Sequence, residues 1–326
     1  KKSTNNTYKG TIPMKLPSET ISGAFELYQT TPEFQKKITS QKTRQQYAYQ
    51  QNRVCELKID DGYVGDVPLA KLTVAKCQEI YWKILESVQS GDGIRFANYT
   101  LQIIVRAWNV LLKYDMLEGR NPWQFVERAK DAPRNKVWTL EQFGEFLTTA
   151  FSVPKWRNIG LLVRINVELG QRVEDIRLST WINYDLKEKL YTREVIQKTK
   201  ERIAGIPISD DLVQMLEEQK QDYSFQDWVV PHPIRLKPYS ENNIARVFRQ
   251  IMNATNLPRE LQLRDIRRTV LSDLADRGCT ETEIMSYSGH KNRESLAPYI
   301  LINTNQARNA AAKRNFDPLS LVKESK

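Results

Sequence analysis

The sequence predicts a mainly helical protein with a small β-sheet, divided into two domains. Apolar residues recur at helical spacing through both halves of the chain, which is typical of amphipathic and core helices. Strand-like runs occur together in one patch of the second half. The length of 326 residues exceeds the size at which one compact core is usual, which favours two domains.

Composition indicates a folded, basic protein. Hydrophobic residues make up 40% of the chain and charged residues 27%, an ordinary balance for a globular protein. Lysine and arginine number 49 against 39 acidic residues, which gives a net charge of +10. Polyanions are therefore candidate partners, although many proteins are simply basic and charge alone does not decide the question.

The cysteines and histidines do not indicate a metal site. Cys55, Cys77 and Cys279 are widely separated and form no CxxC pair, which suits a reducing interior. His232 and His290 are the only histidines, and neither lies near a cysteine. We therefore expect no metal and no cofactor.

The chain carries no pattern that predicts a membrane segment. No apolar run approaches the roughly 20 residues needed to span a bilayer. The polar N-terminus, KKSTNNTYKG, lacks the apolar stretch of a signal peptide. We expect no membrane partner and a cytoplasmic location.

The first domain is predicted to be helical and to span residues 18–130, after an N-terminal extension at 1–17. Helices are expected from Ser18 to about Thr30 and from Thr73 to Ser87, on either side of a basic polar segment. The longer stretch NYTLQIIVRAWNVLLKYDML has apolar residues at helical spacing and is interpreted as core.

The second domain is predicted to span residues 137–326 with a C-terminal tail, after a linker near residues 128–136. Its first helix begins at Thr139, which forms a capping box with Gln142. The strand-like runs are KLYTREVI and ERIAGIPI. Further helices are expected in RNIGLLVRINVELG, after Gln171, from Asp210, from Ser240, from about Leu263 to Arg277, from Thr280, and in an alanine-rich patch of the tail.

Four segments of the second domain carry cationic side chains together with one candidate nucleophile. They are ELGQRVEDIRLSTW, IQKTKERIAGIPI, LRDIRRT and SGHKNRESLAPYI. In this order they resemble the arginine, hairpin-lysine, HxxR, GH and tyrosine boxes of the tyrosine recombinases, a family that includes phage integrases and Xer resolvases. The resemblance covers most of residues 140–300.

The first domain adds to this resemblance. The segments VGDVPLAKLTVAKCQEIYWKIL and LLKYDMLEGRNPW are similar to the helical core-binding domain of the same family. The resemblance implies an N-terminal helical, SAM-like core-binding domain followed by a C-terminal α+β catalytic domain. It also implies a site-specific recombinase that cuts and rejoins DNA through a covalent 3′-phosphotyrosyl link, in support of integration or excision of a phage or mobile element.

Two arginines match the family positions that hold the scissile phosphate, Arg172 and Arg267. Fixed guanidinium groups stabilise the negative charge that develops on phosphate oxygens through bidentate hydrogen bonds. Asp175 lies one helical turn after Arg172, so its carboxylate is expected to orient a neighbouring guanidinium without touching DNA.

The proton-transfer residues are less clearly assigned. The family uses a hairpin lysine as general acid for the leaving oxygen; Lys198 aligns better with it, and Lys200 remains a rival that otherwise contacts DNA. Arg264 stands where the family pattern usually has histidine, three residues before Arg267. An arginine at this position can bind phosphate, but it cannot exchange protons near neutral pH.

The nucleophile implied by the resemblance is Tyr299. His290 precedes it by nine positions, which matches the family separation, and is expected to hydrogen-bond the scissile phosphate. A phenol must lose its proton to attack phosphorus, and surrounding cations favour the phenolate. Pro298, directly before the tyrosine, is uncommon there.

The resemblance implies double-stranded DNA with specific recombination sites as the partner, and a homo-oligomer that is a tetramer on DNA. The protein would then associate with the nucleoid when it acts, in a prokaryotic, viral or mobile-element source. Family members clamp DNA between their two domains, so Lys42, Arg44 and Arg53 are candidates for the duplex backbone, or else lie on a solvated helix face.

Two other functions stay open. A type IB topoisomerase-like enzyme would use the same chemistry to relax DNA as a monomer. A DNA-binding protein of the same fold with weak or lost cleavage is the second alternative, motivated by Arg264 and Pro298.

Overall fold

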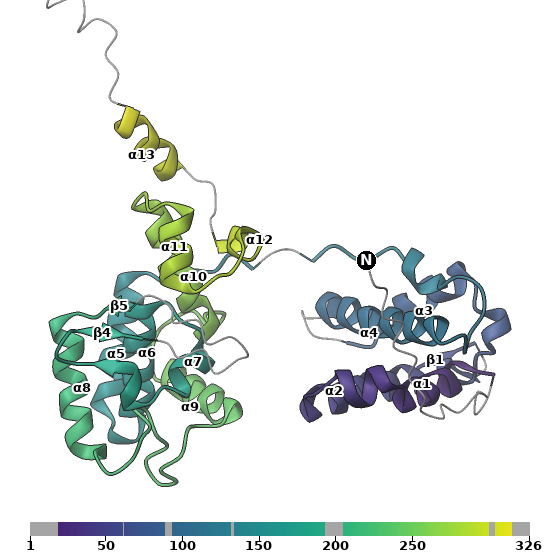
Figure 1. The fold of residues 1–326 in the computed structure, drawn as a ribbon, viewed down its shortest axis with the longest axis horizontal. Coiled ribbons are helices and arrows are strands. Elements are labelled where there is room, and N and C mark those ends of the chain that lie inside the picture. The colour runs from purple at the N-terminus through teal and green to yellow at the C-terminus, as the bar shows by residue number, and fades with distance from the viewer. Residues whose placement is uncertain are drawn as a thin grey trace, which may run out of the picture. The chain divides into compact units, whose positions relative to one another are not determined.

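A computed structural model of the chain describes residues 19–60, 62–88, 93–131, 134–192, 205–299 and 304–314. The chain divides into two compact units, residues 1–133 (unit 1) and residues 134–326 (unit 2). Both units are mainly helical with small antiparallel sheets, so the predicted fold class is confirmed (Figure 1). No helix in the described ranges has the length and apolar character needed to cross a membrane.

Unit 1 is built around the apolar faces of its helices. Its helices are α1 (Ile21–Thr30), α2 (Gln41–Cys55), α3 (Val74–Glu86) and α4 (Gly93–Lys113). The core joins their inward faces, and Trp108 of α4 packs edge-on against Phe25 of α1 and against Trp123. The stretch interpreted as core from its helical spacing forms most of α4, and its apolar residues are the buried face of that helix. The basic polar segment between the first two expected helices forms α2.

A short hairpin in unit 1 was not expected from the sequence. Strands β1 (Lys58–Ile59) and β2 (Gly62–Tyr63) pair in antiparallel fashion. Each strand has two residues, which is too short for the alternating pattern by which strands are identified in a sequence.

Unit 2 contains most of the remaining helices and a three-stranded sheet. Its helices are α5 (Leu140–Ser152), α6 (Arg157–Leu169), α7 (Val173–Arg177), α8 (Asp210–Tyr223), α9 (Glu241–Asn253), α10 (Leu263–Asp276), α11 (Glu281–Ser288), α12 (Arg293–Leu296) and α13 (Thr304–Arg314). The sheet has the order β3 (Tyr184–Asp185), β4 (Leu190–Tyr191) and β5 (Ile206–Pro207), all antiparallel. Both predicted strand-like runs contribute, and residues 193–204 between β4 and β5 lie outside the described ranges.

The core of unit 2 surrounds α6, which is buried along most of its length and packs against α5 and α10. The expected capping boxes are present at Thr139, with Gln142, and at Thr280, with Glu283. The alanine-rich patch forms α13, whose Lys313 Nζ donates to the carbonyl of Gly278 at 2.9 Å.

Candidate active site

The turn between α6 and α7 places the first arginine. Gly170 ends α6 in the left-handed region at φ +58°, and a Cβ there would lie 2.8 Å from Val270 Cγ1 of α10. Glycine therefore permits both the turn and the close approach of α10. Gln171 is buried and donates to the carbonyls of Leu169 and Tyr287 at 2.9 Å each. These contacts fix the turn, and Arg172 is the N-cap residue directly before α7, with an exposed side chain.

The second arginine, Arg267, joins three elements. Its side chain on α10 is 4% exposed and donates to the carbonyl of Gly170 at 3.1 Å and to that of Ser288 at 2.9 Å. Burial, together with the charge of Arg172, lowers the pKa of Arg267 to about 10. Within the described residues, the Nε of Arg267 has no hydrogen-bond partner. The guanidinium groups of Arg172 and Arg267 are thus close enough to repel each other. This arrangement favours the binding of an anion to both.

His290 lies against the same guanidinium. It is 8% exposed, its Nδ1 is 2.7 Å from Ser288 Oγ, and its Nε2 is 3.1 Å from a terminal nitrogen of Arg267. Burial and the charges of Arg267 and Arg172 lower the pKa of His290 to about 4. The imidazole is therefore neutral near pH 7 and keeps one N–H to donate.

Tyr299 ends a 3₁₀ turn, Ala297–Tyr299, and lies beside His290 with 5.3 Å between the ring centroids. Two side chains of α10 hold its backbone: Arg268 donates to the carbonyl of Pro298 at 2.7 Å, and Ser272 to that of Tyr299 at 2.9 Å. The Arg268 guanidinium carbon also lies 5.4 Å from the centre of the Tyr299 ring. The tyrosine is half-buried, with cationic groups on neighbouring sides.

The remaining predicted residues of unit 2 lie at different distances from this cluster. Asp175 is half-buried on α7, and its negative charge acts to raise the pKa of Arg267 against the effect of burial. Arg264 is exposed in the first turn of α10 and lines a cleft of about 680 Å³, as does Val173, the residue after Arg172. Lys198 and Lys200 lie outside the described residues.

The residues predicted to contact the DNA backbone lie on α2 in unit 1. Lys42 is exposed in the first turn. Arg44 donates to the carbonyl of Gln35 at 2.7 Å. Arg53 lies with its guanidinium carbon 4.4 Å from the centre of the Phe96 ring, so it packs on unit 1 in addition to any contact with DNA.

Sequence reasoning missed three side chains that support the site: Ser288, Arg268 and Ser272. The last two lie four residues apart on α10, one helical turn, and Ser288 is two residues before His290. Their partners are backbone carbonyls and a histidine nitrogen, which a sequence pattern does not reveal. In the described part of the chain, no group of three or more His, Cys, Asp or Glu residues is arranged to hold a metal ion.

Comparison with known proteins assigns the chain to a family. The model of the phage integrase family matches residues 138–306, which is more than half of the 326 residues. The chain therefore belongs to the phage integrase family of tyrosine recombinases, as its sequence motifs predicted. A comparison with curated protein sequences finds no match.

Solved structures of integrases share the fold. A lambda integrase tetramer bound to a Holliday junction has a TM-score of 0.69 and 17% sequence identity, with 88% of this chain and 79% of that chain covered. The Tn1549 transposon integrase in complex with transposon right end DNA has a TM-score of 0.72 and 13% identity, with 91% of this chain and 100% of that chain covered. At these identities the likeness is one of fold.

Proposed function

We propose that this protein is a site-specific DNA recombinase that cleaves and rejoins DNA through a covalent bond between Tyr299 and a 3′ phosphate. The observation that carries the proposal is the Tyr299 ring, 5.3 Å from the His290 ring, beside a guanidinium that is itself 3.1 Å from His290. A phenol nucleophile, a hydrogen-bond donor and buried positive charge are together sufficient in kind for phosphodiester transfer: one group attacks and the others stabilise the charge that develops.

In the proposed cleavage step, the phenolic oxygen of Tyr299 attacks the scissile phosphorus and the bond from phosphorus to the 5′ oxygen breaks. The phenolic proton passes to solvent, and the leaving 5′ oxygen takes a proton from Lys198 or Lys200. A 5′ hydroxyl from a partner strand then attacks the phosphotyrosyl bond and releases the tyrosine. One phosphate ester replaces another in each step, so the energy of the broken bond is retained.

The cationic groups act on the phosphate during this step. Arg172 and Arg267 would bind the non-bridging oxygens, whose negative charge increases in the transition state. In the tautomer that carries the proton on Nε2, where Nδ1 accepts from the Ser288 hydroxyl, His290 would donate to one of the same oxygens. Among the described residues the Nε of Arg267 has no hydrogen-bond partner. This is consistent with the role, because a buried donor usually has an acceptor and a substrate oxygen would supply one.

Arg264 would contribute charge and not proton exchange. It replaces the usual family histidine, is exposed, and lines a cleft together with residues of α7 and α9. Substitution of Arg264 by histidine would therefore add a group that titrates near neutral pH. We expect the cleavage rate of this variant to acquire a pH dependence between about pH 6 and 7 that the parent protein lacks.

The proposed partner is double-stranded DNA carrying paired recombination sites, bound by a tetramer. The net charge of +10 favours a polyanion. Support also comes from the solved relatives, one of which is an integrase tetramer on a Holliday junction and others transposon integrases with circular intermediate DNA. These relatives support insertion or excision of a mobile element as the biological outcome.

A DNA-binding protein with weak cleavage is the second candidate, and Arg264 is the observation that favours it. The two candidates differ in covalent chemistry. A topoisomerase-like enzyme would also form the covalent bond, but it would relax supercoiled DNA without exchanging strands between two sites.

The test uses a nicked suicide substrate that carries the candidate attachment site and traps the covalent complex. We expect wild-type protein to shift with the DNA on a denaturing gel, and Tyr299→Phe to bind the same DNA without shifting. Tyr223→Phe is the matched control, because it removes a tyrosine hydroxyl from another part of unit 2. This hydroxyl lies at the end of α8 and accepts from Asn158 Nδ2 at 3.4 Å. Binding without any covalent complex in wild type, on a verified site, would overturn the proposal.

A further inference from the structure

We propose that Arg134 and Asp265 form a positioning pair that holds α10, and with it Arg264 and Arg267, in the orientation needed for DNA cleavage. The inference rests on the proposed recombinase function. It adds a residue that lies outside the matched family model, which begins at residue 138.

The pair itself is bidentate and largely buried. Arg134 Nε donates to one carboxylate oxygen of Asp265 at 2.8 Å, and a terminal nitrogen donates to the other at 2.6 Å. The side chains are 20% and 2% exposed, respectively. Arg134 also donates to the carbonyl of Glu260, and the Asp265 carboxylate accepts from the backbone N–H of Gln262 at 2.9 Å. The pair therefore fixes both the loop before α10 and its first turn.

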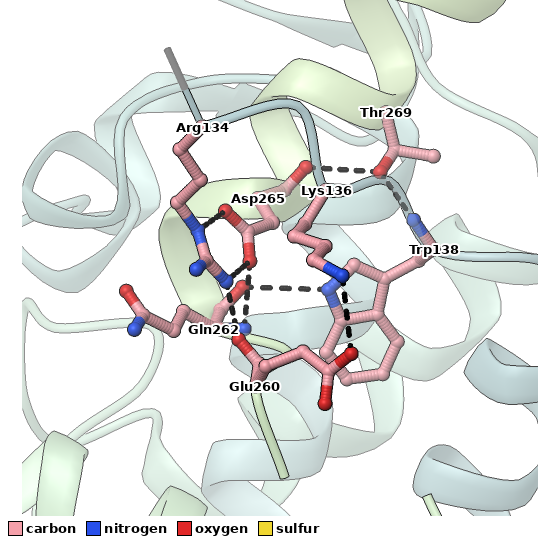
Figure 2. A network of polar contacts seen from close by, with 7 residues as sticks. All are labelled: Arg134, Lys136, Trp138, Glu260, Gln262, Asp265 and Thr269. Carbon is pink, nitrogen blue, oxygen red and sulfur yellow. Dashed lines mark hydrogen bonds and ion pairs between the residues drawn. The ribbon is translucent and has the colours of Figure 1, made fainter. Parts of the chain in front are cut away.

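Further hydrogen bonds join residues 134–138 to the second turn of α10, as Figure 2 shows. The backbone N–H of Trp138 donates to Thr269 Oγ1 at 2.9 Å, and that hydroxyl donates to the carbonyl of Asp265 at 2.9 Å. The indole of Trp138 donates to the carbonyl of Gln262 at 3.3 Å. The stretch expected to be a linker is thus bonded to α10 from Arg134 onward.

The fastened face of α10 is not the face that would meet phosphate. Asp265 and Thr269 are four residues apart and lie on one side of the helix. Arg264 and Arg267 are three residues apart and lie on another, displaced by about 150° at about 100° per residue. Arg134 therefore acts on the two arginines through the helix. If Arg134 were removed, α10 could rotate, and the rotation would displace both guanidinium groups.

Charge gives a second reason for the pair. Asp265 directly follows Arg264 and is two residues from Arg267. A buried carboxylate without a partner would attract a neighbouring guanidinium, because an uncompensated charge in the interior is costly. Arg134 satisfies the carboxylate and leaves the two site arginines available to an incoming phosphate.

The test compares Arg134→Gln with wild type in the suicide-substrate reaction. Because a misplacement of about 1 Å costs up to about 100-fold in rate, we expect covalent complex to form about 10- to 100-fold more slowly in the variant. We expect little change in DNA affinity, because Arg134 bonds the side of α10 that lies away from Arg264 and Arg267. Arg134→Lys keeps one of the two hydrogen bonds and should restore part of the rate. Lys136→Ala removes the half-exposed ion pair with Glu260 and should react like wild type.

A double variant separates positioning from fold stability. Arg134→Gln combined with Asp265→Asn removes the uncompensated charge, so its thermal midpoint should recover toward wild type. We expect its cleavage to stay slow, because the bidentate clamp on α10 is still lost. Recovery of the rate along with stability would mean that Arg134 only neutralises Asp265, and it would overturn the positioning inference. A wild-type rate in Arg134→Gln would overturn it as well. Failure of wild-type protein to form the covalent complex would instead refute the proposed function.

Discussion

His290 should titrate far below an ordinary histidine. Its pKa is lowered from 6.5 to about 4 by burial and by the charges of Arg267 and Arg172. Since the chain has two histidines, His232 and His290, a titration of imidazole signals by NMR resolves both directly. We expect one imidazole signal to keep the chemical shift of the neutral ring down to about pH 5. This signal should be absent from His290→Asn.

The same shift predicts how stability depends on pH. The pKa of His290 is lower in the folded than in the unfolded chain, so the unfolded chain takes up the proton first as pH falls. The free energy of unfolding therefore declines below about pH 6.5 and continues to decline toward pH 4. Between about pH 7.5 and about pH 5 this histidine removes about 2 kcal/mol of stability.

The magnitude is measured as a difference between proteins, because carboxylates also titrate in acid. Urea unfolding at about pH 7.5 and at about pH 5 gives the free energy of unfolding of unit 2 in wild type and in His290→Asn. The difference between the two pH values is the loss of stability. We expect the loss to be smaller in the variant by about 2 kcal/mol. Equal losses, or a His290 signal that titrates near its ordinary pKa, would refute the view that the imidazole is held neutral among cations.

Three other substitutions or treatments test the fold around the site. Gly170→Ala should destabilise unit 2 by about 2–4 kcal/mol in urea unfolding, because its φ of +58° is strained for alanine and the new Cβ would lie 2.8 Å from Val270; an unchanged midpoint would contradict this turn. Trp138→Ala should cost about 3–5 kcal/mol by the same assay, since the indole is 3% exposed and stacks on Phe143 at 5.0 Å. Cys77 is fully buried and its pKa is raised to about 12, so a thiol reagent should modify it only after denaturant is added, and rapid labelling of the native protein would show that α3 opens.

The sequence predicted best where the signal is local and periodic. The capping box at Thr139 gave the start of α5, and the apolar spacing of the stretch around Trp108 gave the buried face of α4. Such features depend on residues three or four apart, whose side chains meet on one helix face. The strands β1 and β3 have two residues each, so they carry no comparable periodicity.

Family motifs at known separations predicted Arg267, His290 and Tyr299 as site residues, and the structure places these three side chains together. The contacts that hold these residues were not predictable, because they join distant parts of the chain or end on backbone carbonyls. Arg134 and Asp265 are 131 positions apart, and no local pattern relates them. The hydroxyl of Ser288, next to His290 Nδ1, is likewise visible only in three dimensions.

The attachment of residues 134–138 to α10 bears on how hybrid recombinases are assembled from two parents. A gene fusion joined at residue 138, where the matched family model begins, would take Arg134 from one parent and Asp265 from the other. A junction placed before residue 134 would carry the donor and acceptor together. We expect more of the hybrids joined before residue 134 to be active, because each of them retains the hydrogen bonds that hold its own α10.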